Sequence, residues 1–315
     1  MGNLRRSYLL ARRGKRTRPD VVAFSNDLEE NLLRIRQSIL DGTLGFGPYC
    51  AFKIYEPKER TIRVAPFVDR VAHHALMRIC EPVFDAYQID DSYACRKGKG
   101  TYAALERAKV HSLKQTWFLK LDMRKYFDSI SHDRLKEFLR YRFKEMAILE
   151  LFDRIIDSHC SDTFPDAELR GLPIGNLTSQ FFANHFLAVA DRYAKEQLGC
   201  RAYLRYMDDI VLWDHDRHRL IQNGMELSTF CKGMGLFVKP WCLNRSSKGI
   251  PLLGYVVYKG FLYLSTRAER RYRAKLKTAW LLLEEGVFEE ESFAAHIVPL
   301  VAFRNHARGR WVPEK

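Results

Sequence analysis

The sequence predicts an α+β fold, and three observations favour this class. Apolar runs of strand type flank tight turns at residues 51–64 and 202–213, which predicts antiparallel hairpins. Apolar residues elsewhere recur at the spacing of amphipathic helices. After Ser265 the composition changes to a basic, helix-forming segment. Strands and helices are therefore expected to form separate parts of the fold.

The N-terminal part of the chain combines a basic arm with helices and one hairpin. Seven Lys and Arg residues precede Pro19, and such an arm is typically mobile alone and orders on a phosphate backbone, although a solubilising tail fits equally well. A helix is expected at residues 27–40, and two strands are expected at residues 51–64 around a turn at 56–59. A further helix through residues 71–79 is expected to stop near Pro82.

The middle and C-terminal parts predict the remaining elements. Residues 117–121 predict a buried strand that ends at Asp122, and Ser131 is expected to cap the following helix. Strands at residues 202–206 and 210–213 flank an acidic turn, and more strand sequence lies at 252–263. The last predicted helix ends at Gly286. These elements divide the chain into an arm (1–19), a central region (20–264) and a helical module (265–315).

Charge is the most informative feature of the composition. Fifty-two Lys and Arg residues oppose 38 Asp and Glu residues, which gives a net charge of +14. This excess favours a polyanionic partner, because each phosphate that a protein neutralises releases condensed counterions. A basic protein that binds no nucleic acid is the alternative on charge alone. The hydrophobic content of 47% suffices for a sizeable core in one large domain or two smaller ones.

Cysteine usage and hydropathy bear on the cellular compartment. The seven cysteines are scattered without a CxxC pair, which predicts reduced thiols in a cytoplasmic protein and argues against a zinc site. No stretch reaches the roughly 18 apolar residues of a membrane helix, and the N-terminus lacks the apolar core of a secretory signal. No membrane partner is expected.

Three aspartates are the strongest candidates for chemistry. Asp208 and Asp209 are adjacent in the tight turn between apolar strands, where two carboxylates repel each other, and Asp122 also lies at a strand end. Two strands of one sheet would bring the three acids together around two Mg²⁺ ions, roughly 3.5–4 Å apart. Such a pair would activate a 3′-hydroxyl and stabilise leaving pyrophosphate, which predicts nucleotidyl transfer. A solvated acidic loop is the alternative, and it is the interpretation of Asp90 and Asp91.

These residues resemble the motifs of reverse transcriptases. Residues 206–209 (YMDD) resemble the YxDD box of that family, and residues 121–130 (LDMRKYFDSI) resemble its first acidic motif. Four further blocks appear along the chain in the order that the family has them: residues 60–66 (RTIRVAP) with Asp69 and Arg70, 92–100 (SYACRKGKG), 171–180 (GLPIGNLTSQ) and 252–255 (LLGY). The resemblance implies a right-hand polymerase with fingers, an antiparallel-sheet palm and, at residues 265–315, a helical thumb. It also implies that Asp122, Asp208 and Asp209 hold the metals.

The block at residues 171–180 narrows the resemblance. Most bacterial and retroviral members carry Gln where this chain has Ile174, and often Pro where it has Gln180. The IGxxxSQ form is similar to reverse transcriptases of diversity-generating retroelements, which copy a template-repeat RNA into cDNA with misincorporation opposite adenines and act with a small basic accessory variability protein. An isoleucine also cannot donate the hydrogen bond that glutamine makes near the incoming sugar, which should weaken discrimination. Ordinary packing of Ile174 remains the alternative.

The resemblance assigns roles to further residues. Arg60 matches the fingers arginine that holds the triphosphate, and Lys53 is its candidate partner across the hairpin, with Arg63 and Lys58 as competitors. Phe127 matches a steric gate against ribonucleotides, with a core position as the alternative. Three basic residues interleaved with glycines are expected to contact the template: Arg96, Lys97 and Lys99. The block that resembles the primer grip includes Gly254. The fourth palm motif fits loosely, and Lys239 is the nearest candidate for its lysine.

Three functions remain open at this point. The first is an error-prone RNA-directed DNA polymerase of a diversity-generating retroelement, with an RNA template, a cDNA or DNA primer, deoxynucleotides and the accessory protein as partners. The second is a group II-like or phage-defence reverse transcriptase of ordinary fidelity. The third is an inactive polymerase-like RNA-binding protein, which the three intact aspartates disfavour.

Overall fold

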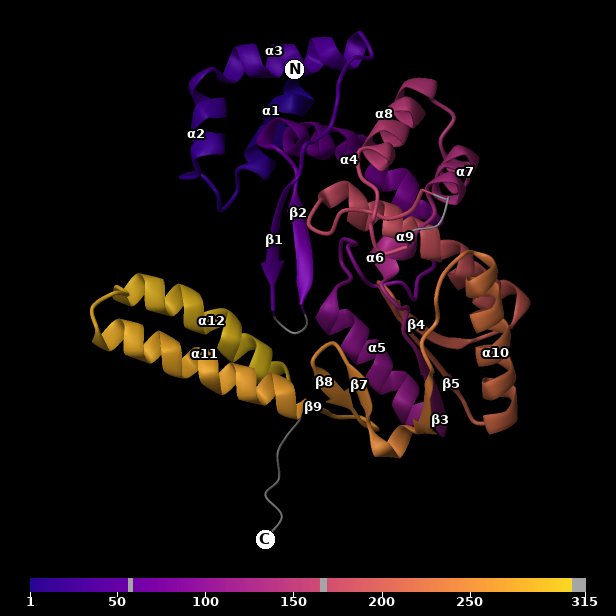
Figure 1. The fold of residues 1–315 in the computed structure, drawn as a ribbon. Coiled ribbons are helices and arrows are strands. Elements are labelled where there is room, and N and C mark those ends of the chain that lie inside the picture. The colour runs from indigo at the N-terminus through magenta and orange to yellow at the C-terminus, as the bar shows by residue number, and fades with distance from the viewer. Residues whose placement is uncertain (56–58, 165–168, 308–315) are drawn as a thin grey trace. The chain divides into compact units, whose positions relative to one another are not determined.

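The structure is a computed structural model that describes residues 1–55, 59–164 and 169–307. Helices predominate in it, and the strands form antiparallel sheets (Figure 1). The helices are α1 (Gly2–Ala11), α2 (Pro19–Asn26), α3 (Leu28–Leu40), α4 (Phe67–Tyr87), α5 (Thr101–Lys114), α6 (Tyr126–Ser129), α7 (His132–Arg142), α8 (Met146–Asp157), α9 (Leu177–Arg192), α10 (Arg217–Gly233), α11 (Thr266–Glu284) and α12 (Glu290–His306). The strands are β1 (Cys50–Ile54), β2 (Arg60–Val64), β3 (Trp117–Leu121), β4 (Ala202–Tyr206), β5 (Asp209–Asp214), β6 (Cys242–Arg245), β7 (Ile250–Leu252), β8 (Tyr255–Val257) and β9 (Leu262–Leu264). The predicted α+β class is confirmed.

The chain folds as two units, each assembled from three separate segments. The first unit comprises residues 1–90, 123–193 and 228–239, and the second comprises residues 91–122, 194–227 and the chain from residue 240. The second unit thereby collects β3, β4 and β5 from two segments that are far apart in the sequence. The division into an arm, a central region and a helical module stays a prediction.

The N-terminal segment differs from the predicted mobile arm, because residues 2–11 form helix α1. Leu4, Tyr8 and Ala11 follow helical spacing and are buried, together with Phe24 and Phe67 of the helices beside them. The rings of Tyr8 and Phe24 stack at 5.8 Å between centroids. The basic side chains of this segment predicted a mobile arm, but its apolar face packs into the core of the first unit.

Helix α4 passes Pro82, where the sequence predicted its end, and continues to Tyr87. Proline removes one hydrogen-bond donor from a helix, so packing must favour the additional turn. Phe84 supplies that packing, because its ring lies in an aromatic cluster of the first unit with Phe143, Phe152 and His185. Tertiary contacts therefore override the local stop signal.

Three elements of the first unit follow the sequence closely. Helix α3 spans the predicted stretch, and the Ser131 hydroxyl caps α7 by accepting from the Arg134 N–H at 3.4 Å. The hairpin β1–β2 also forms, with Lys53 opposite Thr61 and Ile54 opposite Arg60. Of its predicted turn, residues 56–58 lie outside the described residues.

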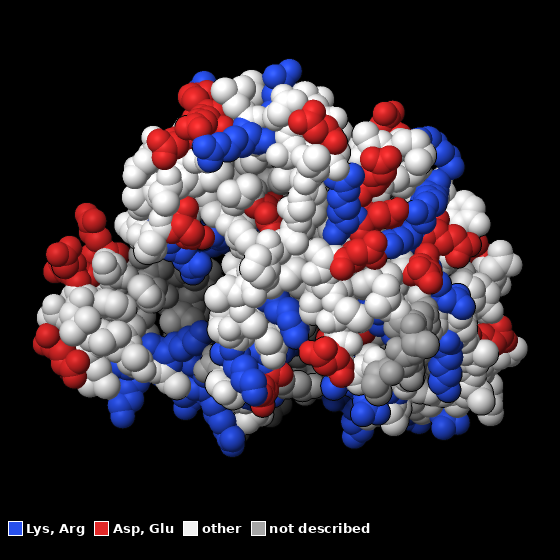
Figure 2. All heavy atoms as spheres, turned by 45° about the horizontal axis from the view of Figure 1, so that its top comes forward, with Lys and Arg blue, Asp and Glu red and all other residues white. Residues whose placement is uncertain are grey.

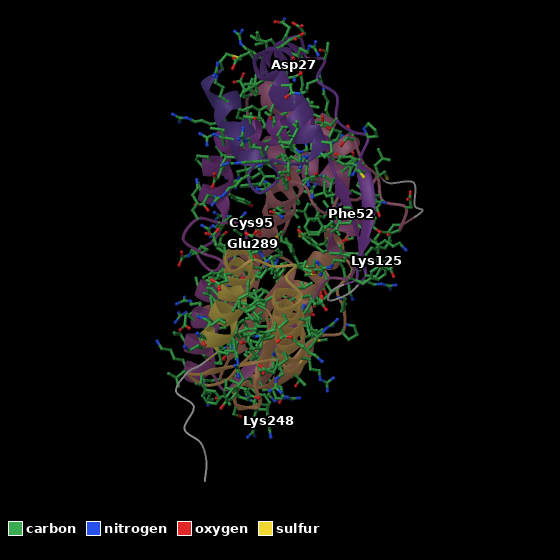
Figure 3. The ribbon with its side chains drawn as sticks, turned by 90° about the vertical axis from the view of Figure 1, so that its left-hand side faces the viewer. Asp27, Phe52, Cys95, Lys125, Lys248 and Glu289 are labelled. Atoms are coloured by element: carbon green, nitrogen blue, oxygen red, sulfur yellow. The ribbon has the colours of Figure 1, made fainter. Side chains whose placement is uncertain are left out.

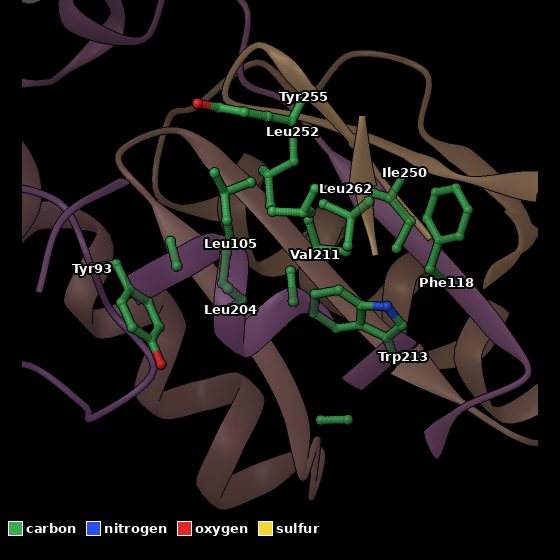
Figure 4. Packing of buried hydrophobic residues seen from close by; sticks show 14 residues of the cluster. Tyr93, Leu105, Phe118, Leu204, Val211, Trp213, Ile250, Leu252, Tyr255 and Leu262 are labelled. Carbon is green, nitrogen blue, oxygen red and sulfur yellow. The ribbon is translucent and has the colours of Figure 1, made fainter. Parts of the chain in front are cut away.

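The second unit is built on a four-stranded antiparallel sheet of order β4-β5-β3-β6. One face carries a buried cluster that Figure 4 shows from close by: Phe118, Val211 and Trp213 from the sheet meet Leu105 of α5 and Leu252 of β7. The small sheet β7-β8-β9 also contributes to this cluster through Ile250, Tyr255, Val257 and Leu262. The cluster holds α5 and both sheets together, and it leaves one end of the large sheet for the polar residues described below.

Helices α11 and α12 run beside each other after β9 and pack through Trp280 and Phe293, whose ring centroids lie 4.7 Å apart (Figure 1). The C-terminal end of α12 returns to β8, where the Tyr255 hydroxyl donates to the Phe303 carbonyl at 2.7 Å. Lys and Arg side chains gather along α11, whereas acidic side chains surround its connection to α12 (Figure 2). Among the described residues, no helix combines the length and apolar character that crossing a membrane requires.

Candidate active site

The paired aspartates lie where β4 turns into β5 in the second unit. Tyr206 pairs with Asp209, so Met207 and Asp208 alone form the turn. Met207 adopts φ +53°, a left-handed backbone conformation that residues other than glycine seldom occupy. A conformation of this kind is retained only where surrounding contacts fix it, and it is found often at functional sites.

The strand register brings Asp122 to the same end of the sheet. Leu121 of β3 pairs with Ile210 of β5, so extending the ladder by one pair sets Asp122 opposite Asp209. Directly opposed residues point to one face, with their Cβ atoms about 4.5–5.5 Å apart. All three aspartates are only partly buried. Three acids from two distant segments thus lie in one unit near the same end of the sheet.

Buried contacts hold the acidic turn from beneath. The side chain of Arg205 is fully buried, and its Nη1 donates to the Met207 carbonyl at 3.2 Å. The Arg205 backbone is fixed as well, because its N–H donates to the Asp91 carbonyl at 2.9 Å and its carbonyl accepts from the Tyr93 N–H at 3.0 Å. These contacts tie the turn to the segment that precedes α5.

Lys120 contacts the acids directly. Its Nζ lies 2.8 Å from Oδ1 of Asp209 and donates to the Pro251 carbonyl at 3.0 Å. Sequence reasoning missed both Lys120 and Arg205. A signal for Lys120 was present, because a strand residue two positions before Asp122 must point to the same face.

The chemistry of the donors fits a hard divalent cation. Carboxylate oxygens are the ligands that Mg²⁺ prefers, and the three aspartates lie near one end of one sheet. As the side chains lie, no three His, Cys, Asp or Glu residues of the described part of the chain gather closely enough to coordinate one ion. One carboxylate of the three, that of Asp209, is directed to Lys120. Coordination would therefore require Asp209 to share or exchange that contact.

The predicted template-binding segment forms a loop before α5 in the second unit. Asp91 anchors the loop through ion pairs to Arg107 at 3.1 Å and Lys195 at 2.8 Å. Arg96 donates to the Ser92 carbonyl, the Lys99 ammonium lies 5.0 Å from the centre of the Tyr93 ring, and Lys97 is exposed. Asp91 is thus buried and paired, which contradicts its interpretation as part of a solvated loop.

Gly254 lies in a two-residue turn between β7 and β8 of the second unit. Leu252 pairs with Tyr255, and both turn residues have positive φ, +52° at Leu253 and +88° at Gly254. Two such residues define a type I′ turn, the form that joins twisted antiparallel strands. A Cβ on Gly254 would lie 3.3 Å from the Phe303 ring, so the C-terminal helix approaches this turn closely.

The predicted triphosphate-binding residues lie on the hairpin of the first unit, which Figure 3 shows around Phe52. The register places Lys53 and Arg60 on opposite faces, so the two are not partners across the hairpin. Lys53 pairs with Glu59 at 2.7 Å. Of the two competitors, Arg63 shares the face of Lys53, and Lys58 lies outside the described residues.

The block around Ile174 packs against that hairpin. The Ile174 carbonyl accepts from the Arg63 N–H at 2.8 Å, and the side-chain oxygen of Asn176 accepts from the Ala65 N–H at 3.2 Å. Gly175 has φ +119°, and a Cβ there would lie 2.8 Å from the Ile62 side chain. Ile174 is half-buried and Gln180 is exposed at the start of α9.

Phe127 and Asp128 lie on the short helix α6 of the first unit. Phe127 is half-buried, and its carbonyl accepts from the Leu172 N–H at 2.9 Å, which joins it to the block at 171–180. Asp128 accepts from the Ser161 hydroxyl at 2.8 Å. That bond gives Asp128 a structural role. Near the end of the same unit, Val238 bridges to Met123, which places Lys239 directly after a short antiparallel contact.

Comparison with known protein families gives one match over most of the strand-bearing region. Residues 56–257 match the family model described as reverse transcriptase (RNA-dependent DNA polymerase). The group II intron-encoded protein LtrA of Lactococcus lactis subsp. cremoris is 25% identical over 171 residues, covering 52% of this chain and 28% of that protein. Protein YkfC of Escherichia coli (strain K12) is 24% identical over 173 residues, covering 52% and 45%. The chain thus spans less than half the length of these relatives.

Solved structures confirm the fold. Apo telomerase from Candida tropicalis, truncated from its C-terminal domain, superposes with a TM-score of 0.54 at 13% identity, covering 73% of this chain and 59% of that one. Telomerase from Candida tropicalis in complex with a TWJ fragment of telomeric RNA gives 0.51 at 11% identity, covering 89% and 56%. The predicted right-hand polymerase fold is confirmed.

Proposed function

Because this chain belongs to the reverse transcriptase (RNA-dependent DNA polymerase) family, we propose that it is an RNA-directed DNA polymerase whose Asp122, Asp208 and Asp209 hold two Mg²⁺ ions. The observation that carries the proposal is the register of β3, β4 and β5, which sets the three carboxylates at one end of one sheet. An RNA template, a DNA primer and deoxynucleotides are the proposed substrates. Seven free thiols support the cytoplasm as its location.

The reaction joins the primer 3′-oxygen to the α-phosphorus of the nucleotide and breaks the bond to pyrophosphate. Bound Mg²⁺ would supply the lowered pKa of the attacking hydroxyl and the stabilisation of the leaving group. The protein has to fix the acids, and the buried Arg205 side chain does so by anchoring the turn at Met207. A rigid turn limits the reorganisation that accompanies the reaction.

The remaining proposed contacts follow the charge and exposure of the site residues. Arg60 on the β1–β2 hairpin would bind the triphosphate, with Lys53 and Arg63 on the opposite face as the alternative, and the half-buried Phe127 would exclude the ribose 2′-hydroxyl. The basic loop before α5 would contact the template through Arg96, Lys97 and Lys99. The type I′ turn that contains Gly254 would hold the primer. Cations beside glycines suit phosphate contacts, because the backbone can approach closely.

A narrower proposal concerns the retroelement type. Ile174 and Gln180 support a reverse transcriptase of a diversity-generating retroelement, which would copy a template-repeat RNA with errors at adenines and act with a small basic accessory protein. Ile174 offers an apolar side chain where a hydrogen-bond donor would restrain the incoming sugar, so pairing errors would be rejected less strongly. The similarity to the group II intron-encoded protein favours the second candidate, a related reverse transcriptase of ordinary fidelity.

Primer extension tests the activity. The wild type is expected to extend a DNA primer on an RNA template with Mg²⁺ and deoxynucleotides. Asp208→Ala should reduce the rate at least about a thousandfold, since metal binding contributes several kcal/mol to the transition state. Asp133→Ala, which removes an exposed aspartate of α7, should retain the wild-type rate. Absence of extension by the wild type would refute the polymerase proposal and favour the third possibility, an inactive RNA-binding protein. Extension by Asp208→Ala at the wild-type rate would refute catalysis at these aspartates.

Sequencing the extension products tests the narrower proposal. With the accessory protein present, errors are expected to concentrate opposite template adenines, and Ile174→Gln should lower their frequency. Accurate copying of adenines by the wild type would support the group II-like alternative and leave the polymerase proposal intact.

A further inference from the structure

Lys120 occupies an unusual position for a lysine, inside the ladder of the palm sheet in the second unit. It lies on β3 between Val211 of β5 and Cys242 of β6, and its side chain is only 19% exposed. The neighbour two residues earlier, Phe118, belongs to the buried cluster. A charged head in such surroundings requires polar partners, while its aliphatic stem covers apolar surface.

The two partners of the Lys120 ammonium come from different parts of the site. Asp209 lies diagonally across the ladder at 2.8 Å from Nζ, with its own side chain 27% exposed. The Pro251 carbonyl of β7 accepts from the same ammonium at 3.0 Å. Strand β7 leads directly into the type I′ turn of Leu253 and Gly254. One side chain therefore connects a proposed metal ligand with the strand before the proposed primer grip.

We infer that Lys120 is a positioning residue that acts as the built-in counter-ion of Asp209 and ties the acidic turn to β7. This inference rests on the proposed function, because it assigns Lys120 a task at the same site. The ammonium offsets one of three neighbouring negative charges and so reduces their repulsion. It also fixes the direction of the Asp209 side chain, so that the position of its carboxylate relative to β7 stays constant.

Removal of this charge has two opposite consequences. Without the ammonium, the three carboxylates attract a divalent cation more strongly, because no positive charge opposes the ion. Asp209 and β7 lose their common anchor at the same time, so alignment of the reacting groups suffers. Cation affinity should therefore rise while turnover falls. A lysine that only stabilises the fold would not shift the two quantities in opposite directions.

The first measurement is Mn²⁺ binding in the absence of nucleotide and nucleic acid. Electron paramagnetic resonance of Mn²⁺ serves as the readout. Lys120→Met and Lys120→Gln are each expected to bind Mn²⁺ about threefold to tenfold more tightly than the wild type, the range of a partly screened ion pair. Lys120→Arg keeps the charge and should retain the wild-type affinity. Lys109→Met is the matched control, because Lys109 forms a 2.8 Å ion pair with Glu106 on α5 at a similar exposure of 25%.

The second measurement is primer extension at saturating Mg²⁺. Both neutral variants should lose about tenfold in kcat with little change in KM for the nucleotide, since alignment rather than nucleotide binding is affected. Lys120→Arg should recover most of the rate, and Lys109→Met should match the wild type. Thermal melting in the presence of a chelator monitors the fold of every variant.

The outcomes separate this inference from the polymerase proposal. Unchanged or weaker Mn²⁺ binding by the folded neutral variants would overturn the role of Lys120, while extension by the wild type and its loss in Asp208→Ala would still support the polymerase. Failure of both neutral variants to fold would also overturn it, because Lys120 would then belong to the framework. Absence of extension by the wild type refutes the polymerase, whereas the Mn²⁺ measurement still decides whether Lys120 opposes a cation at these acids.

Discussion

Gly175→Ala should weaken the first unit through a collision that the structure locates. A Cβ at this position would lie 2.8 Å from the Ile62 side chain and 3.3 Å from the Arg63 carbonyl, both on β2. Overpacking of this kind costs about 1–3 kcal/mol. The φ of +119° adds backbone strain of about 1–3 kcal/mol, because alanine seldom adopts it. The free energy of unfolding should therefore fall by at least about 2 kcal/mol.

Urea unfolding of the wild type and of Gly175→Ala measures this loss in the free energy of unfolding. Gly14→Ala provides the control. Gly14 also lies in the first unit and has φ +69°, but no atom lies within 4 Å of its added Cβ. The control should lose only about 1–2 kcal/mol from strain. Weakened contact between β2 and the 171–180 block should also raise KM for the nucleotide in Gly175→Ala. Equal destabilisation of both variants would refute the collision argument.

Two further predictions follow from individual side chains. Burial lowers the pKa of His185 to about 4, so the folded protein binds fewer protons than the unfolded chain between pH 4 and about 6.5, and stability falls as the pH falls through that window. His185→Gln should reduce the stability lost between pH 7 and pH 5 by about 2 kcal/mol in pH-dependent urea unfolding. Phe127→Ala should raise incorporation of ribonucleotides relative to deoxynucleotides about tenfold or more in primer extension. An unaltered sugar preference would place Phe127 in packing alone.

Local patterns along the chain predicted the site strands well. Apolar runs on both sides of Asp208 and before Asp122 correctly located β3, β4 and β5, because buried strands and tight turns leave strong local signals. Hydrophobic spacing located α3, and a serine located the start of α7. The aspartates stood out for the same reason, since acids at the ends of apolar strands are costly without a function.

Features that depend on three-dimensional packing could not be predicted. The many basic residues of α1 made its apolar, buried face hard to recognise in the sequence. The extension of α4 beyond Pro82 depends on an aromatic cluster formed by distant segments. The strand register, which separates Lys53 from Arg60, is set by pairing rather than by composition. Burial of Arg205 and the contacts of Lys120 likewise arise only when the sheet has formed.

The location of the bound cation tests the central claim most directly. Fe²⁺ loaded in place of Mg²⁺, with ascorbate and peroxide, cleaves the backbone beside the ion, and the fragments can be mapped by mass spectrometry. We predict cuts near Asp122 and near Asp208, both lost in Asp208→Ala. Cuts confined to other segments, or cuts that persist in Asp208→Ala, would contradict a metal site made by these three aspartates.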